Sequence, residues 1–99
     1  MKQITKAIKE KLIANHKKQD GTKEFKAVLK LFNPAGAGTW YLSELNPETN
    51  VAFGLCYITD KEYGYVDLNE LANFKGALGL GIERDKFFTP KTLEECKNL

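Results

Sequence analysis

The segment "GALGLGIERD", from Gly76 to Asp85, holds the residues whose types and spacing could do chemistry. Its three glycines are typical of phosphate-binding loops. A dinucleotide site, however, needs G-x-G-x-x-G between a strand and a helix, and Arg84 stands where the third glycine would be. The P-loop pattern is absent as well. We therefore interpret the glycines as a helix end followed by sharp turns, and we expect no cofactor.

Glu83, Arg84 and Asp85 place an acid, a base and an acid in a row. Adjacent side chains do not face each other in a strand or in a helix, so Arg84, the only arginine, should pair with a carboxylate from elsewhere in the fold. We expect a bidentate pair with Glu44. The other candidates are Asp67 and Glu70. The group Glu44, Glu83, Arg84 and Asp85 would then be a structural clasp or, alternatively, the centre of a small binding or catalytic pocket.

Other catalytic and metal chemistry has little support in the sequence. His16 is the only histidine and lies among lysines, and no motif joins it to Ser43, the only serine. The carboxylates show no spacing that selects a metal, so we expect no catalytic residues and no metal site. Cys56 and Cys96 lack a C-x-x-C pattern, and two free thiols are expected, although a single bridge is left open.

Charge is distributed unevenly along the chain. Residues 1–30 carry nine lysines and three acids, whereas residues 31–83 carry two lysines and seven acids. The basic segment is either the solvated side of a helix or a nucleic-acid surface. The candidate nucleic-acid contacts are Lys6, Lys9, Lys17 and Lys18. A single arginine argues against nucleic acid, and an unknown protein partner is favoured. The candidate partner-binding residues are Trp40, Tyr41, Tyr57 and Tyr65.

Hydrophobic periodicity indicates the elements that must position these residues. A helical period over residues 5–16 predicts an amphipathic helix capped by Thr5. Alternating patterns predict strands over 25–32, 39–45, 51–58 and 63–66, and in the second of these Trp40, Leu42 and Glu44 share one side. The small side of the third strand, at Ala52, Gly54 and Cys56, should let a helix or another backbone approach closely, and we expect one of the helices there. Two short helices should begin after Asp67 and Thr92.

These elements predict one α+β domain over residues 1–99. An antiparallel sheet of about four strands, ordered as consecutive hairpins, should pack with the N-terminal helix and one or two short helices. No apolar run is long enough for a membrane span, and the N-terminus lacks the apolar core of a secretory signal. We therefore expect a cytoplasmic protein without a membrane partner.

Four blocks, "TWYLSELNPE", "AFGLC", "GYVDLNEL" and "GLGIERDKFFTP", resemble in order and spacing the small bacterial proteins known as the domain of unknown function 2958. The resemblance extends from about Thr5 to Pro90. The chain departs from the family in "CYITDKEYGY", where Tyr57 replaces an acidic residue and the loop is shorter. The family's characteristic positions fall on Trp40, Glu44, Pro47, Phe53, Gly54, Tyr65, Glu70, Glu83, Arg84, Asp85 and Pro90.

The resemblance implies a setting more than an activity. Family members are carried by plasmids, phages and integrative elements, often near genes for transfer or antirestriction, and no reaction is established for them. The leading hypothesis is a non-enzymatic protein-binding module of a mobile element that modulates host defence. The alternatives are a nucleic-acid-binding protein that uses the lysine-rich helix and a small enzyme with a pocket around Glu44 and Arg84.

Overall fold

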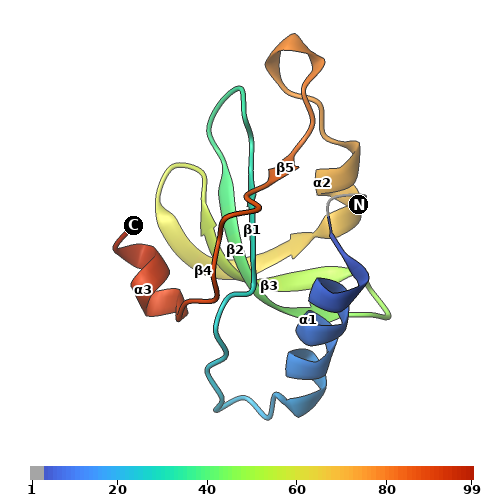
Figure 1. Ribbon diagram of the computed structural model, residues 1–99, viewed down its shortest axis with the longest axis vertical. Helices are drawn as coiled ribbons and strands as arrows, with labels where there is room; N and C mark the ends of the chain where they lie inside the picture. Colours follow the sequence, from blue (N-terminus) through green and yellow to red (C-terminus); the bar gives the residue numbers. More distant parts are fainter. Residues whose placement is uncertain (1–3) are drawn as a thin grey trace.

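A computed structural model describes residues 4–99 as a five-stranded antiparallel sheet with helices on both faces (Figure 1). This confirms the α+β class and adds one strand to the expected four. The strands are β1 (Leu29–Phe32), β2 (Thr39–Asn46), β3 (Val51–Tyr57), β4 (Lys61–Asp67) and β5 (Glu83–Arg84). The helices are α1 (Lys6–Lys18), α2 (Leu68–Asn73) and α3 (Leu93–Lys97), with a 3-10 turn, η1 (Ala77–Gly79), between α2 and β5.

Local sequence signals set the helix ends as expected. The Thr5 hydroxyl accepts a hydrogen bond from the Ile8 amide at the start of α1, and the last turn of α1 is basic, which suits the helix dipole. At α3, Thr92 and Glu95 form a reciprocal capping box. The carboxylate of Asp67 accepts from the Asn69 amide at the start of α2. The three helices therefore begin where the sequence predicts.

The strand order is β4-β3-β2-β1-β5. The first four strands are consecutive hairpins, as expected. The fifth strand, β5, pairs antiparallel with the outer edge of β1, with Arg84 opposite Leu31 and Glu83 opposite Phe32. A two-residue strand with a distant partner has no periodic pattern of its own, so the sequence does not reveal it.

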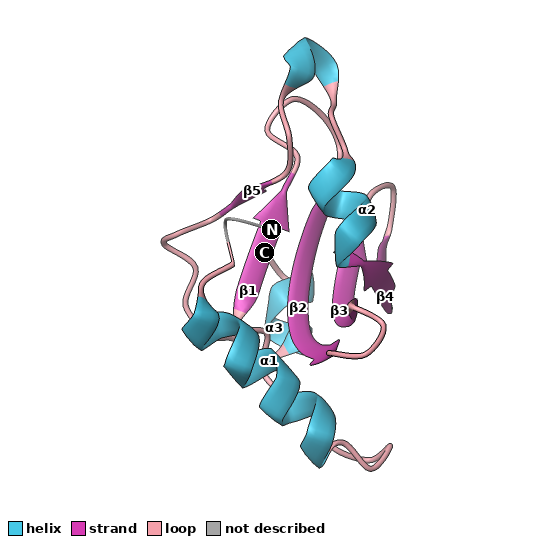
Figure 2. Ribbon diagram, turned by 90° about the vertical axis from the view of Figure 1, so that its right-hand side faces the viewer, coloured by secondary structure: helices cyan, strands magenta, loops and turns pink. Residues whose placement is uncertain are grey.

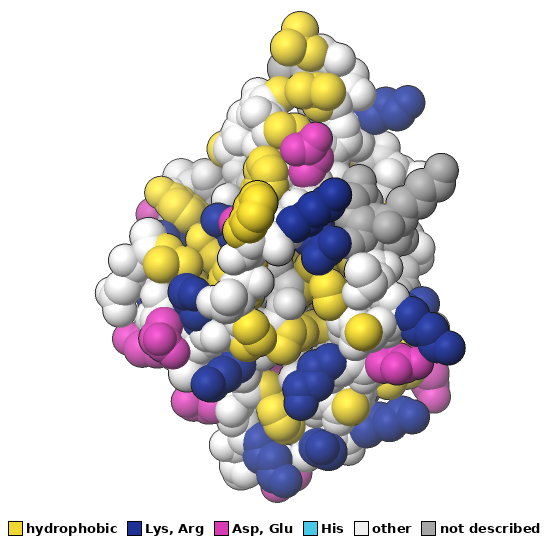
Figure 3. Space-filling view, viewed as in Figure 1, with side chains coloured by type: hydrophobic (Ala, Val, Ile, Leu, Met, Phe, Trp, Pro, Cys, Tyr) yellow, Lys and Arg dark blue, Asp and Glu magenta, His cyan; other side chains and the backbone are white. Residues whose placement is uncertain are grey.

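Residues 74–82 form the loop between α2 and β5 that projects at the top of Figure 1. The helix α2 ends at Asn73 with Phe74 as its cap, before the expected end at Gly76. Gly79 has a φ of +71°, which confirms a sharp turn there. Figure 3 shows hydrophobic side chains at the tip of this projection, where Leu78 is 93% exposed.

Both faces of the sheet are covered. Figure 2 shows α1 and α2 on one face, here called the α1 face, and α3 on the other, here called the α3 face. The α3-face core is smaller and centres on Tyr41, Leu55 and Cys96. The α1-face core consists of Leu12, Leu29, Leu31, Trp40, Leu42, Leu45, Ala52, Leu68, Leu71 and Ile82.

A β-bulge in β2 reverses the alternation of its side chains. Leu42 pairs with Gly54 and Glu44 pairs with Phe53, so the intervening residue, Ser43, has no partner in the ladder. Beyond this extra residue Leu45 faces the α1-face core and Glu44 lies on the α3 face. The expectation that Glu44 shares a side with Trp40 and Leu42 is therefore wrong.

The bulge is fixed from the α1 side. Asn15, buried in α1, donates a side-chain hydrogen bond of 2.9 Å to the backbone carbonyl of Ser43. The Ser43 hydroxyl donates to the carbonyl of Phe53 at 3.3 Å. These bonds satisfy polar groups that the interrupted ladder would leave unpaired.

The small side of β3 packs as expected at Ala52, which lies in the core beneath α1 and α2. Gly54 has a different reason to be small. A Cβ atom at Gly54 would collide with the carbonyl oxygen of Tyr41 and lie 2.8 Å from the Cα atom of Leu42. The backbone of β2 itself, next to the bulge, excludes a side chain there.

We predict that Gly54→Ala lowers the free energy of unfolding by about 3 kcal/mol or more, because neither β2 nor β3 can move without breaking the ladder. Gly64→Ala is the matched control. Gly64 lies directly opposite Gly54 on β4, and a Cβ there meets no atom within 4 Å. Its effect should stay within about 1 kcal/mol. Equal effects of the two substitutions in urea denaturation would contradict the close approach.

Candidate functional site

Glu44 lies at the base of a cavity of about 420 Å³ on the α3 face, here called the Glu44 cavity. Three parts of the chain form its walls: the loop that follows α1, the strands β2 to β4, and the start of α3. The lining side chains with aromatic or charged groups are Lys23, Glu24, Phe25, Glu44, Phe53, Tyr63, Tyr65 and Glu94.

The Glu44 carboxylate is buried, and its hydrogen-bond partner is a neutral amide. Glu44 is only 7% exposed. Oε2 accepts a hydrogen bond of 2.8 Å from Nε2 of Gln19. Within residues 4–99, no lysine or arginine forms an ion pair with it. Buried carboxylates are usually paired, so this one is unusual.

Gln19, the cap of α1, organises the loop that closes one side of the cavity. Its Oε1 accepts from the backbone amides of Gly21 and Lys23, each at 3.0 Å, and its Nε2 also donates to the Lys23 carbonyl at 2.8 Å. The same amide group therefore holds the loop and orients the Glu44 carboxylate.

Aromatic rings form the wall beside this carboxylate. Glu44, Phe53 and Tyr65 lie in one row across β2, β3 and β4. The Phe53 and Tyr65 rings are 5.1 Å apart between centroids and tilted by 55°. At the rim, the Tyr63 hydroxyl donates to the Glu94 carboxylate at 3.3 Å. Carboxylates and ring faces both attract cations, so the arrangement suits a cationic group.

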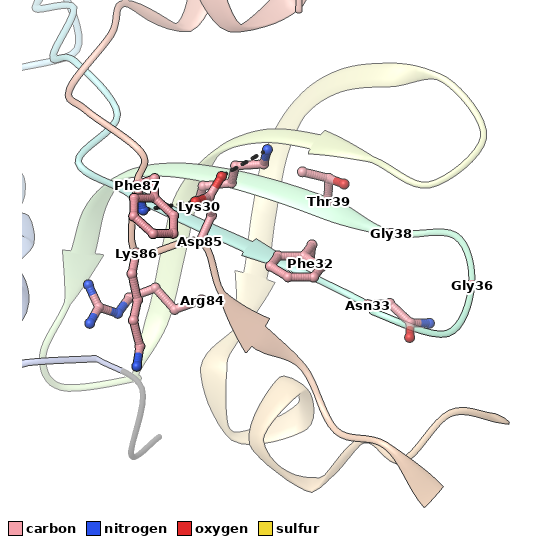
Figure 4. A pocket seen from close by; sticks show the side chains of 10 residues that line it. All are labelled: Lys30, Phe32, Asn33, Gly36, Gly38, Thr39, Arg84, Asp85, Lys86 and Phe87. Atoms are coloured by element: carbon pink, nitrogen blue, oxygen red, sulfur yellow. Dashed lines mark hydrogen bonds and ion pairs between the residues drawn. The ribbon is translucent and has the colours of Figure 1, made fainter. Parts of the chain in front are cut away.

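The expected pair between Arg84 and Glu44 does not form. Arg84 lies opposite Leu31 on the α1 face, whereas the bulge turns Glu44 onto the α3 face. Figure 4 shows the guanidinium directed away from Lys30 and Asp85. The Nε atom of Arg84 is buried and has no hydrogen-bond partner in the described part of the chain. The carboxylate that Arg84 was expected to meet is on the other side of the sheet.

Asp85 makes the clasp that was expected of Arg84. Its carboxylate pairs with Nζ of Lys30 at 3.3 Å and accepts from the Phe87 amide at 2.9 Å, while its own amide donates to the Lys30 carbonyl. Asp85 and Arg84 line a second cavity of about 570 Å³ beside the β1–β2 hairpin (Figure 4). Glu83 is exposed on β5. The four residues of the expected clasp are thus divided between two cavities and the surface.

Two of the four candidate partner-binding aromatics are core residues. Trp40 and Tyr41 are 7% and 5% exposed, because β2 is central and both of its faces are covered. Neither side chain is available at the surface. Tyr57 and Tyr65, nearer the edge of the sheet, are exposed, and Tyr65 lines the Glu44 cavity.

The candidate nucleic-acid contacts Lys6, Lys9, Lys17 and Lys18 are all exposed on α1. One of them, Lys6, lies 3.9 Å from Glu10 in an exposed ion pair. Figure 3 shows basic side chains scattered over the visible face, with hydrophobic and acidic groups between them. They do not gather into a continuous basic groove on that face.

The two cysteines and the metal-binding side chain types are the remaining groups with reactive or ligand chemistry. Cys56 and Cys96 are free thiols, as expected, and burial raises the pKa of both. A higher pKa leaves less of the reactive thiolate at neutral pH. Residues 4–99 contain no group of three or more His, Cys, Asp or Glu side chains placed to hold a metal ion. None of the helices described is long and apolar enough to cross a membrane.

Sequence reasoning did not connect Gln19, Phe25, Phe53 or Tyr63 with Glu44, although Phe53 is one of the family's characteristic positions. The alternating pattern does place Phe53 and Tyr63 on sheet faces, but it does not show which face is left partly open. Gln19 and Phe25 belong to a loop whose position depends on Glu44, and no local pattern records that contact.

We predict an acid-dependent contribution of Asp85 to stability. The hydrogen bond from the Phe87 amide, and then Lys30, lower the pKa of Asp85 below its ordinary value of 3.8. The native state therefore binds protons less readily than the unfolded state, and this stabilisation is lost as the pH falls below about 3.8. Denaturation measured from pH 7 to pH 2 should show Asp85→Asn less stable than the natural protein at pH 7 and approaching it in acid. Parallel curves would contradict the clasp.

Comparisons with known proteins support the resemblance seen in the sequence. Searches of curated proteins and of solved structures gave no match. One family model, described as "Protein of unknown function (DUF2958)", matches residues 3–94. The match covers nearly the whole chain, including β1 to β5 and every residue of the Glu44 cavity. The chain therefore belongs to the domain of unknown function 2958 family.

Proposed function

We propose that this protein is a binding module for another protein and that the Glu44 cavity lies at the centre of its contact surface. The observation that carries the proposal is a buried carboxylate in an aromatic-walled cavity that has no counterion among residues 4–99. Tyr65, 75% exposed, stands at this cavity and offers a large amphipathic contact. Aromatic side chains around a pocket are typical anchors of protein interfaces.

A binding role is favoured over the alternative of a small enzyme with a pocket around Glu44 and Arg84. Those two side chains lie on opposite faces of the sheet, so they cannot act on one substrate. In keeping with the family resemblance, we further propose that the module belongs to a mobile element, works in the cytoplasm and modulates host defence through its partner.

Nucleic acid is the alternative partner, because Lys6, Lys9, Lys17 and Lys18 are all exposed on α1. Such binding would depend on phosphate contacts and would weaken steeply with salt. Fluorescence anisotropy with single- and double-stranded probes at low and high salt separates the two proposals. The protein-binding proposal expects no salt-dependent association with either probe.

Affinity capture from bacterial lysate tests the protein-binding proposal. We expect the natural protein to retain a partner and Tyr65→Ala to reduce the retained amount by about tenfold or more, as for an interface hot spot. Phe87→Ala is the control, because Phe87 is also an exposed aromatic residue but lines the other cavity. Both variants should keep the natural melting temperature. Retention that is the same for the natural protein and Tyr65→Ala would contradict the proposal.

A further inference from the structure

We infer that the Glu44 cavity receives an arginine side chain of the partner protein, with its guanidinium against the Glu44 carboxylate and its flat face against the rings of Phe53 and Tyr65. This inference rests on the proposed function and specifies what the cavity recognises. It follows from the state of the carboxylate, from the cavity walls and from the absence of a suitable arginine on the same face.

The carboxylate needs a further partner. An ionised carboxylate has about four acceptor positions, and the residues described here fill only one at Glu44, with the neutral amide of Gln19. Burial without a cation is unfavourable for such a group. Asp85, by contrast, has Lys30 at 3.3 Å. No residue from 4 to 99 forms an ion pair with Glu44, so this place is open to a cation from another molecule.

The walls favour a flat cation. Phe53 and Tyr65 present two tilted rings next to the carboxylate. A guanidinium can stack on a ring while its fork of N–H groups meets a carboxylate, and it loses hydration more readily than an ammonium group. The neighbouring Tyr63 ring already has Nζ of Lys97 at 4.4 Å from its centroid. The ring pair nearer Glu44 is the one left for a ligand.

The charge of the cavity supports the same ligand. Glu24 and Glu94 add two carboxylates to the lining, against one cation, Lys23. An anion would therefore be repelled. The chain cannot supply the arginine itself, because Arg84 is its only one and lies on the α1 face. A second copy could offer only the same residue, whose Nε atom is buried. The arginine therefore belongs to a different protein.

The inference is tested by titrating the full ¹⁵N-labelled chain with N-acetyl-argininamide and following the amide signals. We expect saturable shifts at Gln19, Glu44 and Tyr65. The citrulline analogue, which has the same shape without the charge, should produce none of them. N-acetyl-lysinamide should bind with an affinity at least about tenfold lower than that of the arginine probe.

Two variants place the binding at the cavity. Glu44→Gln keeps the size of the side chain and should weaken arginine binding by about tenfold or more, since the charge is lost. Tyr65→Ala removes one of the two rings that contact the guanidinium, so it should also weaken binding. Because Tyr65 is exposed, this variant should fold even if Glu44→Gln does not. Glu83→Gln, an exposed carboxylate on β5, should bind like the natural protein. Equal shifts with the citrulline analogue, or binding unchanged in the folded Glu44→Gln and Tyr65→Ala variants, would overturn the inference.

The outcomes separate this inference from the proposed function. If arginine does not bind while Tyr65→Ala still releases the captured partner, the choice of arginine is wrong and the binding module stands. If arginine binds at Glu44 while partner capture does not depend on Tyr65, the cavity does take a guanidinium, but the captured partner does not supply it and the proposed contact surface is wrong.

Discussion

The hydrogen bond from Asn15 to the backbone carbonyl of Ser43 is the interaction on which the site depends. A bulge leaves one residue outside the ladder, and a buried carbonyl at that point needs a donor. Asn15, only 2% exposed, supplies it from α1 at 2.9 Å. One side chain thus docks the N-terminal helix on the sheet and stabilises the irregular strand that it covers.

The direction of Glu44 follows from this bulge. Without the extra residue, strict alternation would turn Glu44 toward the apolar core under α1 and Leu45 toward the other face. With it, Leu45 completes the core and Glu44 reaches the α3 face, where Gln19 holds its carboxylate and the loop after α1 closes the cavity. The close approach of the β2 backbone to Gly54 belongs to the same distortion. The bulge that Asn15 holds from the α1 face therefore places the Glu44 carboxylate on the α3 face.

The parts of the fold that depend on local sequence could be predicted. Thr5 and Thr92 start helices through their own hydroxyl groups, and the alternating segments form consecutive hairpins. The parts that depend on distant contacts could not. The strand β5 exists only because β1 offers an open edge, and the bulge depends on Asn15, 28 positions earlier. The expected pair of Arg84 with Glu44 depends on two such contacts. The bulge turns Glu44 onto the α3 face, and the register of β5 and β1 sets Arg84 in the row of Leu31 and Trp40, four residues along β2 from Glu44.

Nuclear Overhauser contacts of the Glu44 side chain test the central claim most directly, because they report which face of the sheet it occupies. The structure predicts contacts from the Glu44 methylene protons to the side-chain amide of Gln19 and to the ring of Phe53. Contacts to Leu12 or Trp40 in the α1-face core, with none to Gln19, would contradict the bulge and the cavity that depends on it.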